Sequence, residues 1–276
     1  MKQNLFKSTA LVLIGFASCI LSCSKNNSTE QKTSLDELQW IDLTYTFDST
    51  TLYWPNNKDG FMHRTDADGV NKQGFYYSSY SICAPEHGGT HMDAPIHFAA
   101  NKHTADVIPL SNLTGNAVLV DVSVKALKNR DYLISTKDIE EWEKANGIIP
   151  DHTIVLFRTG YGKFYPDRAA YFGTAEKGDA AIPLLHFPGI SEEAALYLTT
   201  KRKVKAVGLD TPSLDYGQSK DFKAHRTLLA ENCPGFENLA QLDQLPTKGF
   251  YIVALPMKIG KGSGGPLRII AGIYPK

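Results

Sequence analysis

Apolar and β-branched residues gather in five short runs from residue 117 onward. Runs of this length and composition are typical of strands that are buried in a sheet. The runs span residues 117–124, 153–157, 204–209, 250–255 and 267–273. We therefore expect the core of the fold to be a sheet that is built from this part of the chain.

Helix-start signals separate the first three of these runs. Ser135 is followed by Asp138, which together make a weak capping box, and Gly147 is suited to end the helix. Ser191 precedes two glutamates, which favour the positive end of a helix dipole. The alternation of strands and helices predicts an α/β fold with a mixed β-sheet core and flanking helices.

The composition agrees with a single folded domain. Of the 276 residues, 42% are hydrophobic, so the chain can bury a sizeable core and bulk disorder is excluded. The 29 basic and 29 acidic residues cancel, which argues against a nucleic-acid partner. No Pro- or Ser-rich linker divides residues 40–276, and we expect one domain over residues 39–276.

The N-terminal segment is typical of an export signal. Two lysines precede an apolar stretch at residues 9–21, which is too short to span a membrane. Residues 20–23 resemble the bacterial lipoprotein box, with a small residue directly before Cys23. This pattern predicts a signal peptide at 1–22, a lipid anchor at Cys23 and a polar tether at 23–38. The protein is then exported and membrane-anchored, facing the periplasm. The alternative is a plain signal peptide in which Cys23 has no role.

The densest cluster of chemically active side chains lies at residues 87–98. It contains His87, His91, Asp93 and His97, while two glycines and a proline oppose a helix. In an extended chain, His91, Asp93 and His97 share one face, and His87 can join them from a glycine-rich turn. Imidazoles and a carboxylate that converge in this way favour a divalent transition metal.

A glycine-rich stretch at residues 260–265 matches the pattern G-x-G-x-x-G. A proline and a strand-like run follow it instead of a helix, so dinucleotide binding is disfavoured. Ser263 lacks a nucleophile elbow because Lys261 stands where that motif requires Gly, which disfavours a serine hydrolase. The stretch is expected to be a structural or substrate-side loop.

The cluster at 87–98 resembles the signature of the metal-dependent cyclase family, which includes bacterial kynurenine formamidase and isatin hydrolase. The resemblance continues nearly to the end of the chain. It includes residues 157–160, the stretch 210–215, His225, residues 237–239 and residues 254–258. The resemblance implies a swivelling β/β/α-like fold and a homodimer.

In the kynurenine formamidase branch, the resemblance implies two divalent metals, with Zn favoured and Mn or Fe as alternatives. It places the first ion on His87, His91, Asp93 and Glu237. It places the second on Asp93, Glu237 and His225, with the two carboxylates bridging. Spacing alone does not single out His225 or Glu237. The isatin hydrolase branch has a non-carboxylate residue in place of Glu237 and carries one metal.

By the same resemblance, the protein is an arylformamidase-like hydrolase of an amide or formamide bond, with N-formyl-L-kynurenine as the leading substrate. Hydroxide from metal-activated water attacks the carbonyl, and His97 is the proton shuttle. Trp54 resembles a family residue that lines the substrate pocket, although an aromatic packing role is equally compatible with its position. The alternatives are a cyclic-imide or isatin-type ring hydrolase and a non-catalytic solute-binding lipoprotein.

Overall fold

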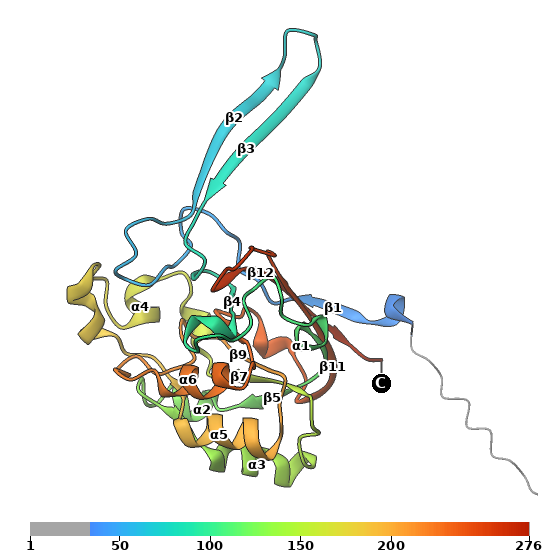
Figure 1. The fold of residues 1–276 in the computed structure, drawn as a ribbon, viewed down its shortest axis with the longest axis vertical. Coiled ribbons are helices and arrows are strands. Elements are labelled where there is room, and N and C mark those ends of the chain that lie inside the picture. The colour runs from blue at the N-terminus through green and yellow to red at the C-terminus, as the bar shows by residue number, and fades with distance from the viewer. Residues whose placement is uncertain (1–33, 276) are drawn as a thin grey trace, which may run out of the picture. The chain divides into compact units, whose positions relative to one another are not determined.

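The computed structural model describes residues 34–275, which belong to one compact unit (Figure 1). The predicted signal peptide, Cys23 and most of the predicted tether lie outside the described residues. The last residues of that tether form a short 3-10 helix, η1 (Leu35–Glu37), which begins with a capping box between Ser34 and Glu37. No helix within residues 34–275 is long and apolar enough to cross a membrane.

An eight-stranded mixed sheet forms the core, in the order β1-β12-β11-β5-β7-β9-β10-β4. Its strands are β1 (Gln39–Asp42), β12 (Gly264–Ile273), β11 (Lys248–Pro256), β5 (Thr114–Asp121), β7 (Ile154–Arg158), β9 (Ala206–Leu209), β10 (Gly235–Glu237) and β4 (His91–Asp93). The strands β5, β7, β9 and β10 run parallel, and the other pairings are antiparallel. Because β4 also pairs with β12, the sheet closes on itself.

All five predicted strands are present in this sheet, with one correction. The run at 117–124 does not stay extended to its end, because β5 stops at Asp121 and a short helix, α2 (Ser123–Ala126), follows. The Asp121 carboxylate accepts a hydrogen bond from the Ser123 backbone N–H at 2.8 Å, which turns the chain. Strands β1, β4 and β10 were not predicted.

Both predicted helices are confirmed as α3 (Thr136–Asn146) and α5 (Glu192–Lys201), with Ser135 and Ser191 as their N-caps. Figure 1 shows α2, α3 and α5 on one side of β5. Alternate residues of β5 explain this layering, because Val118 and Val120 face these helices while Ala117 and Leu119 face the interior of the closed sheet.

The remaining elements lie outside the main sheet. The helices are α1 (Leu110–Leu113), α4 (Arg168–Phe172), α6 (Lys223–Ala230), η2 (Pro95–His97), η3 (Tyr161–Phe164), η4 (Asp179–Leu184) and η5 (Leu242–Gln244). The strands β6 (Leu133–Ile134) and β8 (Gly189–Ile190) form a small parallel pair. The strands β2 (Met62–Val70) and β3 (Tyr76–Cys83) form a hairpin that projects away from the core (Figure 1).

Candidate metal centre

The residues of the cluster at 87–98 enter the site through a tight turn and the short strand β4. At Gly89 the backbone φ is +54°, and a side chain at Gly88 would lie 2.1 Å from the ring of Tyr53. A side chain at Gly89 would also lie 2.7 Å from the ring of Phe47, so glycine is required at both positions and the turn brings His87 beside β4. The predicted extended chain stops at Asp93, because Pro95–His97 form η2, yet His97 still lies beside the cluster.

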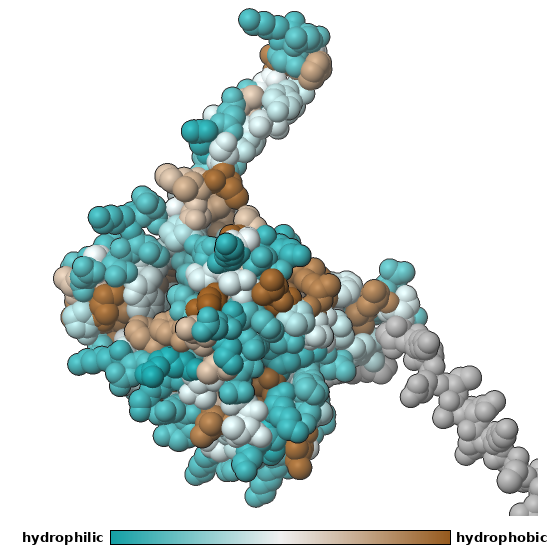
Figure 2. All heavy atoms as spheres, in the orientation of Figure 1, coloured by the Kyte–Doolittle hydropathy of each residue, from teal (hydrophilic) through white to brown (hydrophobic). Residues whose placement is uncertain are grey.

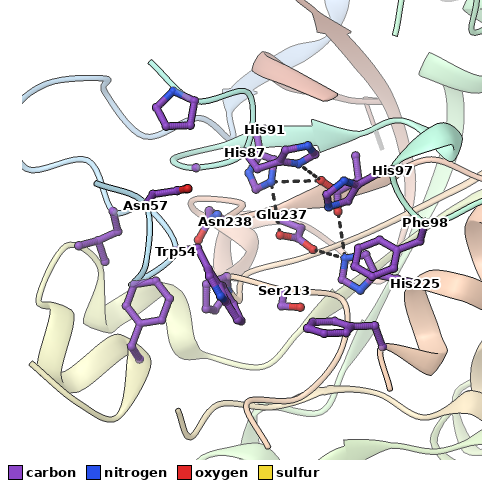
Figure 3. Close-up of a pocket in the computed structure, with 17 residues that line it drawn as sticks. Trp54, Asn57, His87, His91, His97, Phe98, Ser213, His225, Glu237 and Asn238 are labelled. Carbon is purple, nitrogen blue, oxygen red and sulfur yellow. Dashed lines mark hydrogen bonds and ion pairs between the residues drawn. The ribbon is translucent and has the colours of Figure 1, made fainter. Parts of the chain in front are cut away.

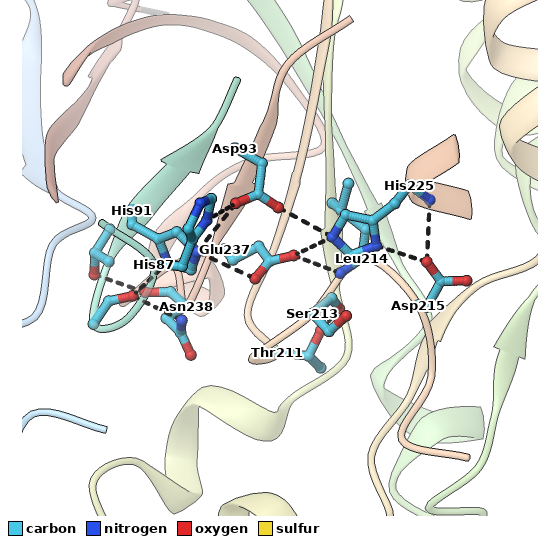
Figure 4. Close-up of polar contacts among 12 residues, drawn as sticks. His87, His91, Asp93, Thr211, Ser213, Leu214, Asp215, His225, Glu237 and Asn238 are labelled. Carbon is cyan, nitrogen blue, oxygen red and sulfur yellow. Dashed lines mark hydrogen bonds and ion pairs between the residues drawn. The ribbon is translucent and has the colours of Figure 1, made fainter. Parts of the chain in front are cut away.

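Pairing between β4 and β10 brings the carboxylates of Asp93 and Glu237 together. His91 and Asp93 lie on β4, and Glu237 on β10 is the strand partner of His91. His91 Nε2 is 3.2 Å from an Asp93 oxygen and 3.5 Å from a Glu237 oxygen (Figure 4). His87 Nδ1 lies 2.6 Å from the same Asp93 oxygen. The structure thus brings these four predicted ligands to one place.

Helix α6 supplies the fifth side chain from the opposite side. His225 Nε2 is 3.0 Å from the second Asp93 oxygen and 3.2 Å from a Glu237 oxygen (Figure 4). Its other ring nitrogen lies 2.6 Å from Asp215, which also accepts the His225 backbone N–H at 3.0 Å. Asp215 therefore holds the imidazole so that Nε2 faces the two carboxylates.

Four of these side chains are almost fully buried. Asp93 is 1% exposed, His91 and Glu237 are 3% exposed, and His225 is 4% exposed. Burial and the charge of Asp93 raise the pKa of Glu237. Burial disfavours protonated His91, but its hydrogen bond to Asp93 and the two nearby carboxylates outweigh this and raise its pKa to about 9. The cluster is therefore built to attract positive charge.

The donor set fits divalent cations. Two ligands of a tetrahedral Zn²⁺ at about 2.1 Å from the ion are about 3.4 Å apart. The four distances that join His91 and His225 to Asp93 and Glu237 range from 3.0 to 3.5 Å. His91 and His225 each lie within 3.5 Å of both carboxylates, and this mixture of imidazole and carboxylate donors fits divalent cations.

His97 stands at the open side of this cluster. Its ring stacks on that of His87, with the ring centres 3.9 Å apart, and its donor atom lies within 4.8 Å of those of His87 and Asp93. Desolvation by the surrounding protein lowers the pKa of His97, although part of the ring is exposed to solvent. The imidazole is therefore neutral at pH 7 and can accept a proton.

A cavity of about 310 Å³ opens over the cluster (Figure 3). Its polar floor is made by His87, His91, Asp93, His225 and Glu237, and its walls include Leu52, Trp54, Phe98, Phe172 and Phe222. The structure places Trp54 in this wall, where it also packs edge-on against Phe172 and Phe187. Apolar walls around a few polar groups are typical of a site for a small organic ligand.

Sequence reasoning did not identify several residues that shape this site. The Asn238 side chain donates a hydrogen bond to the Gly89 carbonyl at 2.7 Å and accepts one from the Tyr171 hydroxyl at 2.8 Å. Phe98 and Phe222 complete the apolar wall. For Phe98, its place directly after His97 is a signal that could have been used. Nothing in the sequence marks Phe222 or Tyr171.

Two charged side chains near the site have structural roles. Asp210 accepts hydrogen bonds from Thr159, Gly160 and Gly162, and so it orders the turn after β7. Arg158 pairs with Asp121 at 2.6 Å at the end of the neighbouring strand.

Cys83 and Cys233 are both free, the first exposed and the second buried.

Comparison with known proteins decides the family. Residues 41–216 match the model of a family that is described as "Putative cyclase". The chain belongs to the putative cyclase family. The family resemblance seen in the sequence motifs is thus confirmed, as is the mixed α/β fold.

The relatives of the chain include proteins named isatin hydrolase and kynurenine formamidase. The chain is 34% identical over 199 residues to an isatin hydrolase of Roseibium aggregatum, covering 69% of this chain and 73% of that protein. It is 28% identical over 230 residues to a kynurenine formamidase of Salinibacter ruber, covering 83% and 95%. The structure of isatin hydrolase A from Ralstonia solanacearum matches with a TM-score of 0.76 at 31% identity, covering 87% and 93%.

Proposed function

We propose that this protein is a metal-dependent hydrolase of a carbon–nitrogen bond in a small aryl amide or formamide. The observation that carries this proposal is the convergence of Asp93 and Glu237 with three imidazoles under an apolar cavity. His87, His91, Asp93 and Glu237 would hold one divalent ion, and Asp93, Glu237 and His225 a second. Zn²⁺ is the leading candidate, with Mn²⁺ and Fe²⁺ as alternatives.

Bound divalent ions would supply a water of lowered pKa and stabilise negative charge on the substrate carbonyl. The residues of the chain supply the rest. The aromatic wall with Trp54 and Phe172 binds the aryl group and excludes water. His97 is neutral, faces the cavity and can carry a proton from the attacking water to the leaving nitrogen. Cleavage of the C–N bond then releases an acid and an amine.

A cyclic substrate is the second candidate. Ring opening of an isatin-type compound also cleaves a carbon–nitrogen bond next to an aryl ring, and the relative with 34% identity is an isatin hydrolase. The presence of Glu237 between His91 and His225 favours the formamidase type, because it offers a second bridging carboxylate. N-formyl-L-kynurenine is the leading formamide on the basis of relatives such as that of Salinibacter ruber.

Metal analysis of the purified full chain tests the proposal. We expect about two divalent ions per chain, loss of aryl formamide hydrolysis after chelation, and recovery on adding Zn²⁺. Elemental analysis beside assays with formanilide and isatin would measure this. One ion per chain with isatin turnover supports the ring hydrolase. A protein that binds no metal after loading contradicts both enzymes and leaves a solute-binding lipoprotein.

Replacing Trp54 by Ala is expected to raise KM and to leave kcat almost unchanged. Removing an aromatic wall that contacts the substrate equally in ground and transition state weakens uniform binding, by about 1–2 kcal/mol or roughly tenfold. Trp54→Phe keeps an aromatic ring and serves as the matched control. Steady-state kinetics with formanilide would measure both variants. A fall in kcat with unchanged KM would show that Trp54 does not bind the substrate.

Location and assembly stay predictions. Lipid attachment at Cys23, export and a periplasmic face depend on residues that lie outside the described range 34–275. We also propose a homodimer, to which the β2–β3 hairpin would contribute. Figure 2 shows this hairpin standing clear of the rest of the surface. Its exposed aromatic residues, which offer contact area, are Phe75, Tyr76, Tyr77 and Tyr80.

A further inference from the structure

The glycine-rich loop at residues 260–265 lies directly against His87. Ser263 Oγ is 2.9 Å from His87 Nε2, on the side of the ring away from Asp93. The same hydroxyl donates a hydrogen bond to Glu86 at 2.6 Å, and the Ser263 backbone N–H donates another to that carboxylate at 2.8 Å. A continuous chain therefore runs from Glu86 through Ser263 and His87 to Asp93.

Counting protons along this chain fixes the state of His87. A serine hydroxyl has one proton, and an ionised carboxylate can only accept. Because Ser263 Oγ gives its proton to Glu86, it must accept a hydrogen bond from His87 Nε2–H. His87 Nδ1 lies 2.6 Å from an oxygen of Asp93, so it donates a hydrogen bond to that carboxylate while no cation is bound. A cation bound to Asp93 would replace this proton and leave the proton on Nε2 in place.

The loop is built so that Ser263 cannot move away. The Ser263 carbonyl accepts a hydrogen bond from Ala94 N at 2.8 Å, and the Gly262 carbonyl accepts one from Ala105 N at 2.9 Å. Gly264 pairs with Asp93 in the β12–β4 ladder. A side chain at Gly264 would lie 2.6 Å from the His87 ring, so glycine is required for this close approach.

We propose that Ser263 and Glu86 are positioning residues that fix His87 as the Nε2–H tautomer and so make Nδ1 its metal ligand. This role rests on the proposed metal-dependent function, and it explains why a glycine-rich loop without a nucleotide site stands at this point of the chain. Hydrogen-bond partners of a ligating imidazole orient the ring and raise its basicity. Removing the hydroxyl leaves both tautomers of His87 accessible and the ring free to turn.

The test compares Ser263→Ala with the conservative Ser263→Thr. We expect Ser263→Ala to weaken Zn²⁺ binding by about 10–100-fold, as is typical when such a partner is lost. Ser263→Thr keeps the hydroxyl and should restore the affinity to near the wild-type value. Glu86→Gln should weaken binding less, because an amide oxygen can still accept from Ser263. Competition against a chromogenic zinc chelator measures all four proteins, and Lys261→Ala serves as a control in the same loop.

A second readout does not depend on metal binding. Nitrogen-15 NMR of the histidine side chains in the metal-free protein shows which ring nitrogens of His87 carry a proton. We expect Nε2 of His87 to carry a proton in the wild type and in Ser263→Thr, and to lose it in a large share of the Ser263→Ala molecules, where only Asp93 still accepts from the ring. Wild-type zinc affinity in Ser263→Ala, or wild-type His87 without a proton at Nε2, would overturn the proposal. Wild-type protein that binds no zinc would instead refute the proposed function, while the tautomer remains readable.

Discussion

Replacing Glu237 by Gln is expected to lower the metal content of the purified protein from about two ions per chain to about one. Glu237 is buried, with one oxygen 3.5 Å from His91 Nε2 and the other 3.2 Å from His225 Nε2. Gln has the same shape and its oxygen can still accept the Leu214 backbone N–H, which Glu237 does at 2.7 Å. The substitution therefore removes a negative charge and a ligand oxygen but little packing.

The loss of the second ion is also expected to reduce catalysis. A metal ion that stabilises developing charge contributes several kcal/mol, and about 4 kcal/mol corresponds to roughly a thousandfold drop in kcat/KM. Elemental analysis and formanilide kinetics on the same preparation measure both effects. The exposed Glu231, at the end of α6, gives the matched control Glu231→Gln, which should keep both ions and full activity.

The opposite result would change the proposed metal centre. If the wild type holds one ion and Glu237→Gln holds the same one, Glu237 is not a metal ligand. The buried carboxylate would then only serve as an acceptor for Leu214 N and a partner for His225. Such a centre would resemble the single-metal branch that the sequence analysis associated with isatin hydrolase.

The sequence predicted the sheet core well, because those strands are continuous apolar runs. The sequence did not predict the neighbouring strands β4 and β10, and the reason is physical. β4 and β10 have three residues each and are stabilised by pairing with strands that are distant in sequence. A three-residue strand has no periodicity to detect, and its existence depends on the closed sheet.

The site residues likewise fall into those that local spacing predicted and those that come from distant parts of the chain. His87, His91, Asp93 and His97 are close in sequence, so local spacing alone indicated a metal cluster. His225 and Glu237 reach it from α6 and β10, and only family resemblance pointed to them. The Ser263–Glu86 pair joins loops that are 177 residues apart, which no local pattern reveals. The extended conformation predicted through His97 was wrong because Pro95 begins a 3-10 helix, whose φ angle suits proline.

Replacing His97 by Ala is expected to lower kcat for aryl formamides by about 100- to 10,000-fold, as is typical when a general acid–base group is lost. The metal content should stay at the wild-type level, since the ions have five other ligands. Formanilide kinetics and elemental analysis would measure this. His152 is exposed in a left-handed turn that Asn tolerates, so His152→Asn is the control and should retain full activity.

The leaving group separates proton transfer from other roles of His97. An amide nitrogen must be protonated before it can leave, whereas the phenolate of an aryl formate ester leaves without a proton. If His97 is the proton shuttle, His97→Ala should lose far less activity toward 4-nitrophenyl formate than toward formanilide, because only the amide also needs a proton on its leaving group. Equal losses on both substrates with reduced metal content would instead make His97 a ligand. The donor atom of His97 lies within 4.8 Å of those of His87 and Asp93, so this outcome is structurally accessible.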